Sequence, residues 1–166
     1  MTRTSGRKVN NVISVLTEVA TCALVGTLAT DPHSDWYERL HKPRWQPPGA
    51  AFPIVWTALY ADIALTSAAV LNHLDSQGRP KAAPNYRWAL ALNLAANAGW
   101  SVAFFGVKQL RASVPVAAGL AASSADLARR AGRVRPAYGI LLAPYTVWAG
   151  FATVLNTRIA MLNPEQ

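Results

Sequence analysis

Long apolar stretches separated by short polar segments dominate the pattern of this chain. The 20 residues Trp88–Val107 and the 22 residues Pro136–Thr157 contain no Asp, Glu, Lys or Arg. About 20 helical residues cross a hydrocarbon core of roughly 30 Å, so each stretch has the length of a membrane-spanning helix. These two stretches therefore predict two transmembrane helices.

Three further segments have the same apolar character but carry an interrupting charge: Asp62, Glu18 near the start of the first segment, and Asp126 in a short fourth segment. Short connections would leave nearly every backbone polar group satisfied inside a helix, as lipid requires. The sequence predicts an all-α integral membrane protein, a five-transmembrane-helix bundle that forms a single domain over residues 1–166. The helices are expected at about 9–30, 49–73, 86–107, 112–128 and 136–160, with a first loop at 31–48.

Composition agrees with a membrane protein. Apolar residues make up 52% of the 166 residues and charged residues only 14%, against roughly 25% charged in typical soluble domains. The length suits one domain rather than separate cofactor and substrate domains. The single cysteine, Cys22, excludes an intrachain disulfide framework and CxxC redox chemistry.

The formal net charge of +8, taken alone, fits either nucleic acid or an anionic membrane surface as a partner. The basic residues cluster between the apolar stretches, which favours membrane lipid and argues against nucleic acid. Ten of the 16 Lys and Arg residues lie in the N-terminus, the second loop and a fourth loop expected at 129–135, and six lie on the other side. By the positive-inside rule this bias places the N-terminus in the cytoplasm.

The first loop contains the densest group of aromatic and cationic residues. Prolines restrict the residues that precede them to extended backbone, so the three prolines of this loop make it stiff. The residues concerned are Trp36, Tyr37, Arg39, Lys42, Pro43, Arg44, Trp45, Pro47 and Pro48. Rigid aromatics beside cations suit a flat anionic ligand, but they also suit an interfacial belt in which the cations meet lipid phosphates.

Three predicted helices carry aromatic and amide residues at helical spacing, which places them on one face of each helix. The three sets are Trp56, Tyr60 and Ile63; Asn93, Asn97, Trp100 and Phe104; and Tyr145, Trp148, Ala152 and Asn156. At matching depth such residues would line a cavity with flat apolar walls and a few hydrogen-bonding groups, which is typical of a small-molecule site. The alternative is that the amides hydrogen-bond between helices and the tryptophans only pack.

Asp62 lies near the middle of its predicted helix and, at 3.6 residues per turn, faces away from Trp56 and Tyr60. A carboxylate at bilayer depth costs about 2.5 to 3.5 kcal/mol, so we expect it to face the bundle and find a donor or take up a proton. The three histidines have no ligand-like spacing and no cysteine partner, so no metal site is predicted. No Ser-His-Asp order, phosphate-binding loop or dinucleotide fingerprint indicates a hydrolase or a nucleotide-driven mechanism.

Three motifs carry a resemblance to a known family. The first runs from Trp36 to Tyr60 and reads WYERLHKPRWQPPGAAFPIVWTALY, the second begins at Asn97 and reads NAGWSVAFFG, and the third begins at Pro144 and reads PYTVWAGFATVLN. In this order and spacing they closely resemble the TspO/translocator protein family of tryptophan-rich sensory proteins and peripheral-type benzodiazepine receptors. The resemblance covers about residues 30–160.

Two departures limit what the resemblance implies. Gly49, Ala50 and Ala51 stand where many relatives have an aromatic residue shortly after the double proline, which widens the expected pocket mouth or loosens the loop. The end of the fifth predicted helix, residues 155–158, lacks the tyrosine of the cholesterol-recognition motif of the animal members. Sterol binding by that motif is therefore not implied for this chain.

The resemblance implies a membrane receptor, carrier or sensor that binds porphyrin-type tetrapyrroles, such as protoporphyrin IX or haem, between its helices and needs no cofactor. The expected ligand-binding residues are Trp36, Arg39, Lys42, Trp45, Trp56, Tyr60, Asn93, Asn97, Trp100, Phe104, Tyr145 and Trp148. One alternative is an enzyme for light- and oxygen-dependent porphyrin degradation, with Trp56 and Trp148 catalytic, and another is a ligand-free membrane scaffold.

A homodimer is a further expectation. Ala95, Gly99 and Ala103 repeat every four positions on the third predicted helix, and small residues at this spacing let two helices approach closely. The same spacing equally fits close contacts inside one bundle.

Overall fold

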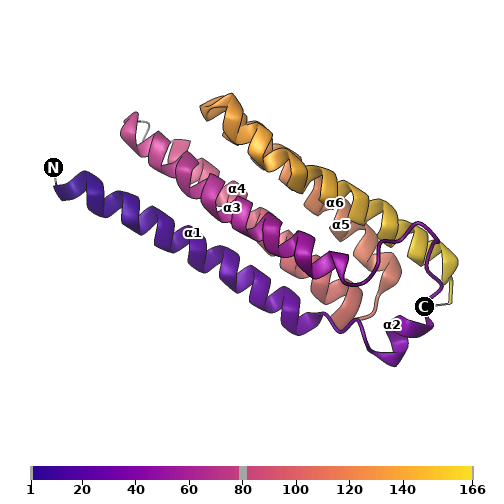
Figure 1. The fold of residues 1–166 in the computed structure, drawn as a ribbon. Coiled ribbons are helices and arrows are strands. Elements are labelled where there is room, and N and C mark those ends of the chain that lie inside the picture. The colour runs from indigo at the N-terminus through magenta and orange to yellow at the C-terminus, as the bar shows by residue number, and fades with distance from the viewer. Residues whose placement is uncertain (1, 79–81, 166) are drawn as a thin grey trace.

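Five long helices run along one bundle in the computed structural model, which describes residues 2–78 and 82–165 (Figure 1). They are α1 (Thr2–Ala29), α3 (Ala51–Ser76), α4 (Ala82–Ser101) with its continuation η1 (Val102–Gly106), α5 (Leu110–Val134) and α6 (Pro136–Leu162). A short helix, α2 (Asp35–Arg39), lies in the first loop. The described part of the chain contains no strand, which confirms the all-α prediction.

Successive long helices alternate in direction, so the two chain ends lie at opposite ends of the bundle (Figure 1). The N-terminus and the α5–α6 connection lie at one end, which we call the N-terminal end. The helix α2, the α4–α5 connection and the C-terminus lie at the other, which we call the α2 end. Part of the predicted second loop, with its charges at Arg79 and Lys81, lies outside the described residues.

Four of the described helical segments are long and apolar enough to cross a membrane: Gly6–Ala29, Ala51–Ser76, Ala82–Gly106 and Pro136–Leu162. Their length and hydropathy agree with the prediction of several membrane-spanning helices. α5 is not among them, because Ala, Ser and Gly make up most of its length and its last turns are charged. The predicted fifth span is therefore not confirmed by length and hydropathy.

The sequence placed a loop at 129–135, but Arg129, Arg130 and Arg133 lie in the last turns of α5. Asp126 accepts hydrogen bonds from Arg129 Nη2 and Arg130 Nε, three and four residues further on, and such pairs stabilise a helix. The prediction was wrong because it used charge as the sign of a loop. The true connection is short, since α6 already begins at Pro136, where proline suits the first helical turn.

Each of the other long helices extends beyond one of its predicted bounds, α1 and α4 at the start and α3 and α6 at the end, and α2 interrupts the predicted first loop. α2 forms because Ser34 caps it, its hydroxyl accepting from the Tyr37 N–H. α4 does not stay α-helical to residue 107 but ends in the π-helical turn η1, and Lys108 then adopts a left-handed backbone with φ of 59°. These turns position the aromatic residues of the α2 end.

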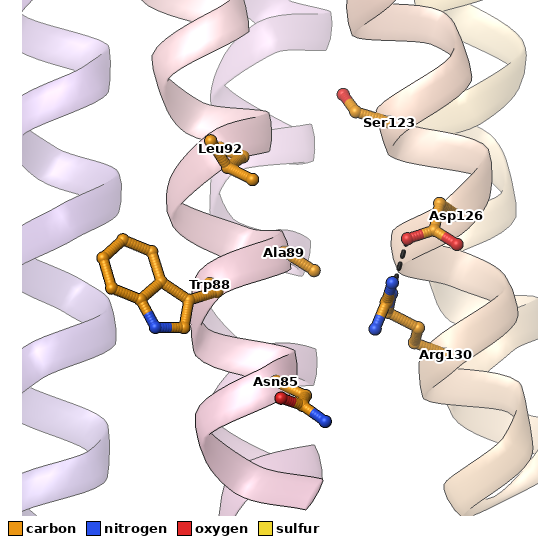
Figure 2. A pocket seen from close by; sticks show the side chains of 7 residues that line it. All are labelled: Asn85, Trp88, Ala89, Leu92, Ser123, Asp126 and Arg130. Atoms are coloured by element: carbon orange, nitrogen blue, oxygen red, sulfur yellow. Dashed lines mark hydrogen bonds and ion pairs between the residues drawn. The ribbon is translucent and has the colours of Figure 1, made fainter.

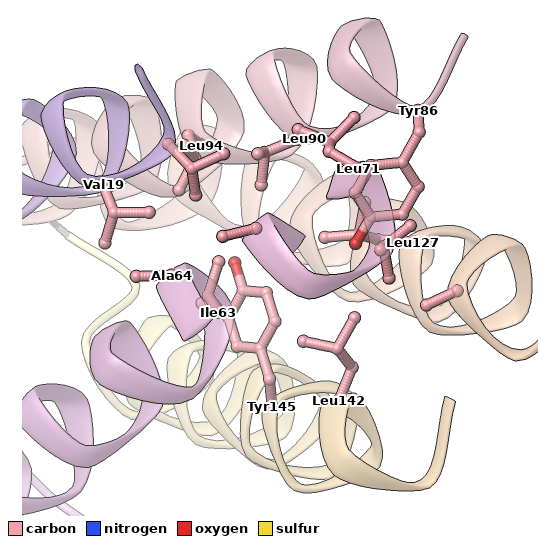
Figure 3. Packing of buried hydrophobic residues seen from close by; sticks show 14 of the residues in the cluster. Val19, Ile63, Ala64, Leu71, Tyr86, Leu90, Leu94, Leu127, Leu142 and Tyr145 are labelled. Carbon is pink, nitrogen blue, oxygen red and sulfur yellow. The ribbon is translucent and has the colours of Figure 1, made fainter. Parts of the chain in front are cut away.

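The larger hydrophobic cluster lies between the long helices, towards the N-terminal end of the bundle, and is mainly aliphatic (Figure 3). The core residues labelled there come from all five long helices: Val19, Ile63, Ala64, Leu71, Tyr86, Leu90, Leu94, Leu127, Leu142 and Tyr145. α5 packs most extensively on α6. The two helices approach closely at Gly132 and Gly139, where a Cβ added to Gly139 would lie 2.9 Å from the Gly132 Cα.

Candidate ligand-binding site

Trp56 on α3 is the centre of an aromatic cluster between three helices. Its ring centroid lies 5.6 Å from that of Tyr60, 6.1 Å from that of Trp100 on α4 and 6.4 Å from that of Tyr145 on α6. Trp100 continues the cluster to Phe104, 6.2 Å away in η1. The structure thus brings together aromatic residues that the sequence placed on three separate helices.

A chain of hydrogen bonds, which we call the polar relay, runs behind these rings. The Tyr60 hydroxyl donates to Asn97 Oδ1 at 3.0 Å, and Asn97 Nδ2 donates to the Tyr145 hydroxyl at 3.1 Å. The Tyr145 hydroxyl in turn donates to Asn93 Oδ1 at 2.8 Å, and Asn93 Nδ2 donates to Ser123 Oγ on α5 at 2.9 Å. The relay therefore links four helices, so Asn93 and Asn97 make the interhelical bonds that the sequence left as an alternative to ligand contacts.

A second set of hydrogen bonds fixes the orientation of Trp100. Its indole Nε1 donates to Asn156 Oδ1 at 2.8 Å, and Ser113 Oγ donates to the same oxygen at 3.0 Å. Asn156 Nδ2 donates to the Leu110 carbonyl at 3.3 Å. The Trp100 ring is thereby held by α5 and α6 from behind.

A second aromatic row lies beside the cluster and reaches the surface. Phe52 and Trp148 have ring centroids 5.9 Å apart, Trp148 and Phe151 5.2 Å, and Phe151 and Trp45 5.9 Å. Trp45 is 49% exposed, whereas the Trp148 Nε1 is buried and donates to no acceptor in the described part of the chain. This row leads from an exposed ring to a buried N–H donor.

Phe52 and Phe151 were missing from the residues expected to bind a ligand. Each had a signal in the sequence, because Phe52 lies four residues before Trp56 and Phe151 three residues after Trp148, which are spacings that share a helix face.

The first loop closes over the cluster at the α2 end. Trp36 lies 6.0 Å from Phe104 and Tyr37 lies 5.4 Å from Phe105, measured between ring centroids. The loop is held to the end of α6 because Asn163 Oδ1 accepts from the His41 N–H and Asn163 Nδ2 donates to the His41 carbonyl, both at 2.9 Å.

The cations of this loop differ in availability. Lys42 Nζ donates to the Tyr37 and Glu38 carbonyls at the end of α2 and lies 4.4 Å from the Tyr37 ring centroid. Partial burial lowers the pKa of Lys42 from its usual 10.5. Lys42 thus caps the C-terminal end of α2, whereas Arg39 and Arg44 are exposed at the surface of the loop.

Asp62 finds its donor on its own helix. Its Oδ1 accepts from Thr66 Oγ1 at 2.9 Å, one turn further along α3, while its Oδ2 is buried and accepts from no donor in the described ranges.

Trp88 is 70% exposed on α4, which fits an interfacial position rather than the cluster. Within residues 2–78 and 82–165 no three His, Cys, Asp or Glu side chains form a group suited to a metal ion.

Comparisons with known proteins agree with the three sequence motifs. The family model of the TspO/MBR family matches residues 13–162. A tryptophan-rich sensory protein of Cereibacter sphaeroides is 33% identical over 89% of this chain and 90% of its own length. The tryptophan-rich protein TspO of Chlorobaculum tepidum is 34% identical over 88% and 93%, and the translocator protein of Ovis aries is 33% identical over 75% and 72%.

The family match confirms the resemblance that the motifs indicated, and it extends over most of the chain. Together with the four long apolar helices, it fits an integral, multi-pass membrane protein.

Proposed function

Because the chain belongs to the TspO/MBR family, we propose that it is a membrane receptor, carrier or sensor that binds a porphyrin-type tetrapyrrole without a further cofactor. Protoporphyrin IX and haem represent the ligand class, which is flat, apolar and carries two propionates. The buried Trp148 N–H, which has no acceptor within the described residues, carries the proposal, because a buried donor of this kind calls for a partner. A tetrapyrrole would supply both an acceptor and a flat face.

The ligand would enter along the second aromatic row. Trp45 is half-exposed at the mouth of this row, and exposed Arg39 and Arg44 belong to the same loop, so a propionate could meet a cation while the ring system stacks on Trp148. Trp56 and Trp100 would form the inner wall, fixed by the polar relay and by Asn156.

We further propose that α5 is the fifth membrane crossing and that the N-terminus is cytoplasmic. α5 lies beside α6 along the bundle in Figure 1, and its 25 residues correspond to about 37 Å of helix. The Arg-rich end of α5 lies at the same end of the bundle as the N-terminus, which supports a common cytoplasmic side.

A homodimer through α4 is proposed on a separate observation. A Cβ added to Gly99 would meet nothing within 4 Å, and Ala95 is exposed. Ala95 and Gly99 therefore make no close contact inside the bundle, which favours a second copy as their partner.

The test follows the absorption spectrum of protoporphyrin IX with the purified protein, in darkness and in light. We expect a stable spectral shift in the dark. Trp148→Ala should weaken binding by about 1 to 3 kcal/mol, or roughly 5- to 150-fold in Kd, by analogy with aromatic stacking on planar bases. Trp88→Ala removes an equally large but exposed ring and should leave Kd unchanged.

Equal losses in the two variants would overturn the site. A light-dependent new product that Trp56→Phe and Trp148→Phe slow more than they weaken binding would favour the enzyme alternative. An unchanged spectrum without tryptophan quenching would favour a ligand-free scaffold.

A further inference from the structure

Two cavities lie at the N-terminal end of the bundle, and Ser123, the last residue of the polar relay, is the one lining residue that they share with the candidate ligand-binding site described above. The larger, of about 450 Å³, lies between α4 and α5 (Figure 2), and the smaller, of about 300 Å³, also touches the end of α3. Asn85 and Arg130 line both cavities. The two cavities are therefore adjacent, and we call them together the α4–α5 groove.

The groove has an apolar wall and a charged wall. Ala89 and Leu92 on α4 extend it towards the middle of the bundle, about two helical turns beyond Asn85, and Leu92 is 65% exposed. Arg130 faces them from α5, with Arg133 further towards the N-terminal end. In Figure 2 the Asp126 carboxylate and the Arg130 guanidinium lie on the α5 side, opposite Ala89.

The charged wall keeps a positive excess. Asp126 accepts from both Arg129 and Arg130, so one carboxylate serves two guanidinium groups. Arg133 and Arg135 have no carboxylate within ion-pair distance in the described part of the chain. The last turns of α5 and the residue after them therefore hold four arginines against one carboxylate.

The groove lies at the depth of the membrane interface. Trp88 lines the same cavity as Arg130 and is 70% exposed, and exposed tryptophans of membrane helices gather at headgroup level. Lipid phosphates lie at this depth, and basic pockets between transmembrane helices bind the headgroups of anionic lipids.

We propose that the α4–α5 groove binds an anionic phospholipid, whose phosphate meets Arg130 and Arg133 and whose upper acyl chain lies along Ala89 and Leu92. A soluble anion would use the arginines but not the apolar wall, which is why the groove favours a lipid. Asp126 competes with the phosphate for Arg130 and so limits the affinity. This proposal does not rest on tetrapyrrole binding, because it uses other residues.

The experiment measures how much phosphatidylglycerol stays bound to the full-length protein by native mass spectrometry from mixed micelles, with phosphatidylcholine as the neutral lipid. We expect phosphatidylglycerol to be retained in preference, and Arg130→Gln and Arg133→Gln each to reduce its retention about fivefold. Asp126→Asn should increase retention, because it frees Arg130. Arg158→Gln removes an exposed charge on α6, away from the groove, and should behave as wild type.

Equal losses of phosphatidylglycerol retention in Arg158→Gln and Arg133→Gln would mean that only the overall charge matters, which would overturn the site. Absence of a preference for phosphatidylglycerol, or its displacement by millimolar inorganic phosphate, would overturn the lipid as the occupant. If Arg130→Gln fails to fold, Arg133→Gln still decides, because Arg133 is exposed and has no carboxylate partner among the described residues.

Discussion

Replacing Gly139 by alanine tests the close contact between α5 and α6. A Cβ at this position would lie 2.9 Å from the Gly132 Cα, 3.0 Å from the Ala128 carbonyl oxygen and 3.2 Å from the Gly132 nitrogen. All three are backbone atoms of α5, so no side-chain rotation can relieve the contact. Carbon atoms prefer separations of about 3.5 to 4.0 Å, so α5 and α6 would have to separate by roughly 0.5 to 1 Å.

The magnitude follows from two opposing effects. Overpacking that forces a backbone shift costs about 1 to 3 kcal/mol. Alanine is the better helix former, which returns about 1 kcal/mol at either glycine of α6. Gly150→Ala provides the matched control, since a Cβ at Gly150 meets nothing within 4 Å. The difference between the two variants therefore isolates the overpacking cost of about 1 to 3 kcal/mol.

The assay is the thermal midpoint of helix loss, followed by circular dichroism in detergent. A cost of 1 kcal/mol lowers Tm by about 2 to 4 °C in a chain of this size, so Gly139→Ala should melt roughly 2 to 12 °C below Gly150→Ala. Gly132→Ala should be milder than Gly139→Ala, because its Cβ would lie 3.6 Å from the Gly139 Cα. Equal midpoints for Gly139→Ala and Gly150→Ala would refute the close approach of α5 and α6.

Two further predictions concern the site. Tyr145→Phe removes the hydroxyl that accepts from Asn97 and donates to Asn93, so the Tm of this variant should fall by an amount corresponding to about 0.6 to 1.7 kcal/mol. Tyr138→Phe on the same helix is the control, because the Tyr138 hydroxyl makes no hydrogen bond in the described structure. Its Tm should equal that of the wild type. Burial lowers the pKa of Lys42 in the folded protein, so just below pH 10.5 the unfolded chain binds more protons than the folded chain does. The free energy of unfolding of the wild type, relative to that of Lys42→Met, should therefore rise with pH in this range. A fall would contradict the burial of Lys42.

The charge-free stretches predicted α4 and α6 well because lipid leaves few alternatives to a helix where no charge interrupts twenty residues. The prediction of helix ends was weaker where a helix continues past the apolar stretch into charged residues. Arg129 and Arg130 look like loop residues in a hydropathy pattern, yet their pairing with Asp126 keeps them helical. Such pairing depends on spacing rather than on composition, and a search for carboxylates three or four residues before each arginine would have found it.

Helical spacing identified the aromatic faces, but it could not give the contacts between them. Trp56 and Tyr60 share a face of α3, and the sequence gives no measure of whether Trp100 or Trp148 meets them across the bundle. In the structure Trp100 does, while Trp148 packs with Phe52 and Phe151 in the second row. Relative rotation and depth of the helices decide this, and both are set by long-range packing rather than by local pattern.

The two aromatic groups differ in the free energy needed to separate them, and this difference predicts where the proposed ligand would enter. Opening the relay side would break the buried bonds of Asn97 and Tyr145, and a buried polar group left without a partner costs about 1 to 3 kcal/mol. In the second row neither Trp45 nor Trp148 makes a side-chain hydrogen bond within the described structure, so only ring contacts worth about 0.5 to 1.5 kcal/mol each must be replaced. A flat ligand restores ring contacts as it enters, whereas it cannot restore every bond of the relay. For the proposed ligand we therefore expect entry at the second row, with the relay keeping α3, α4 and α6 in register.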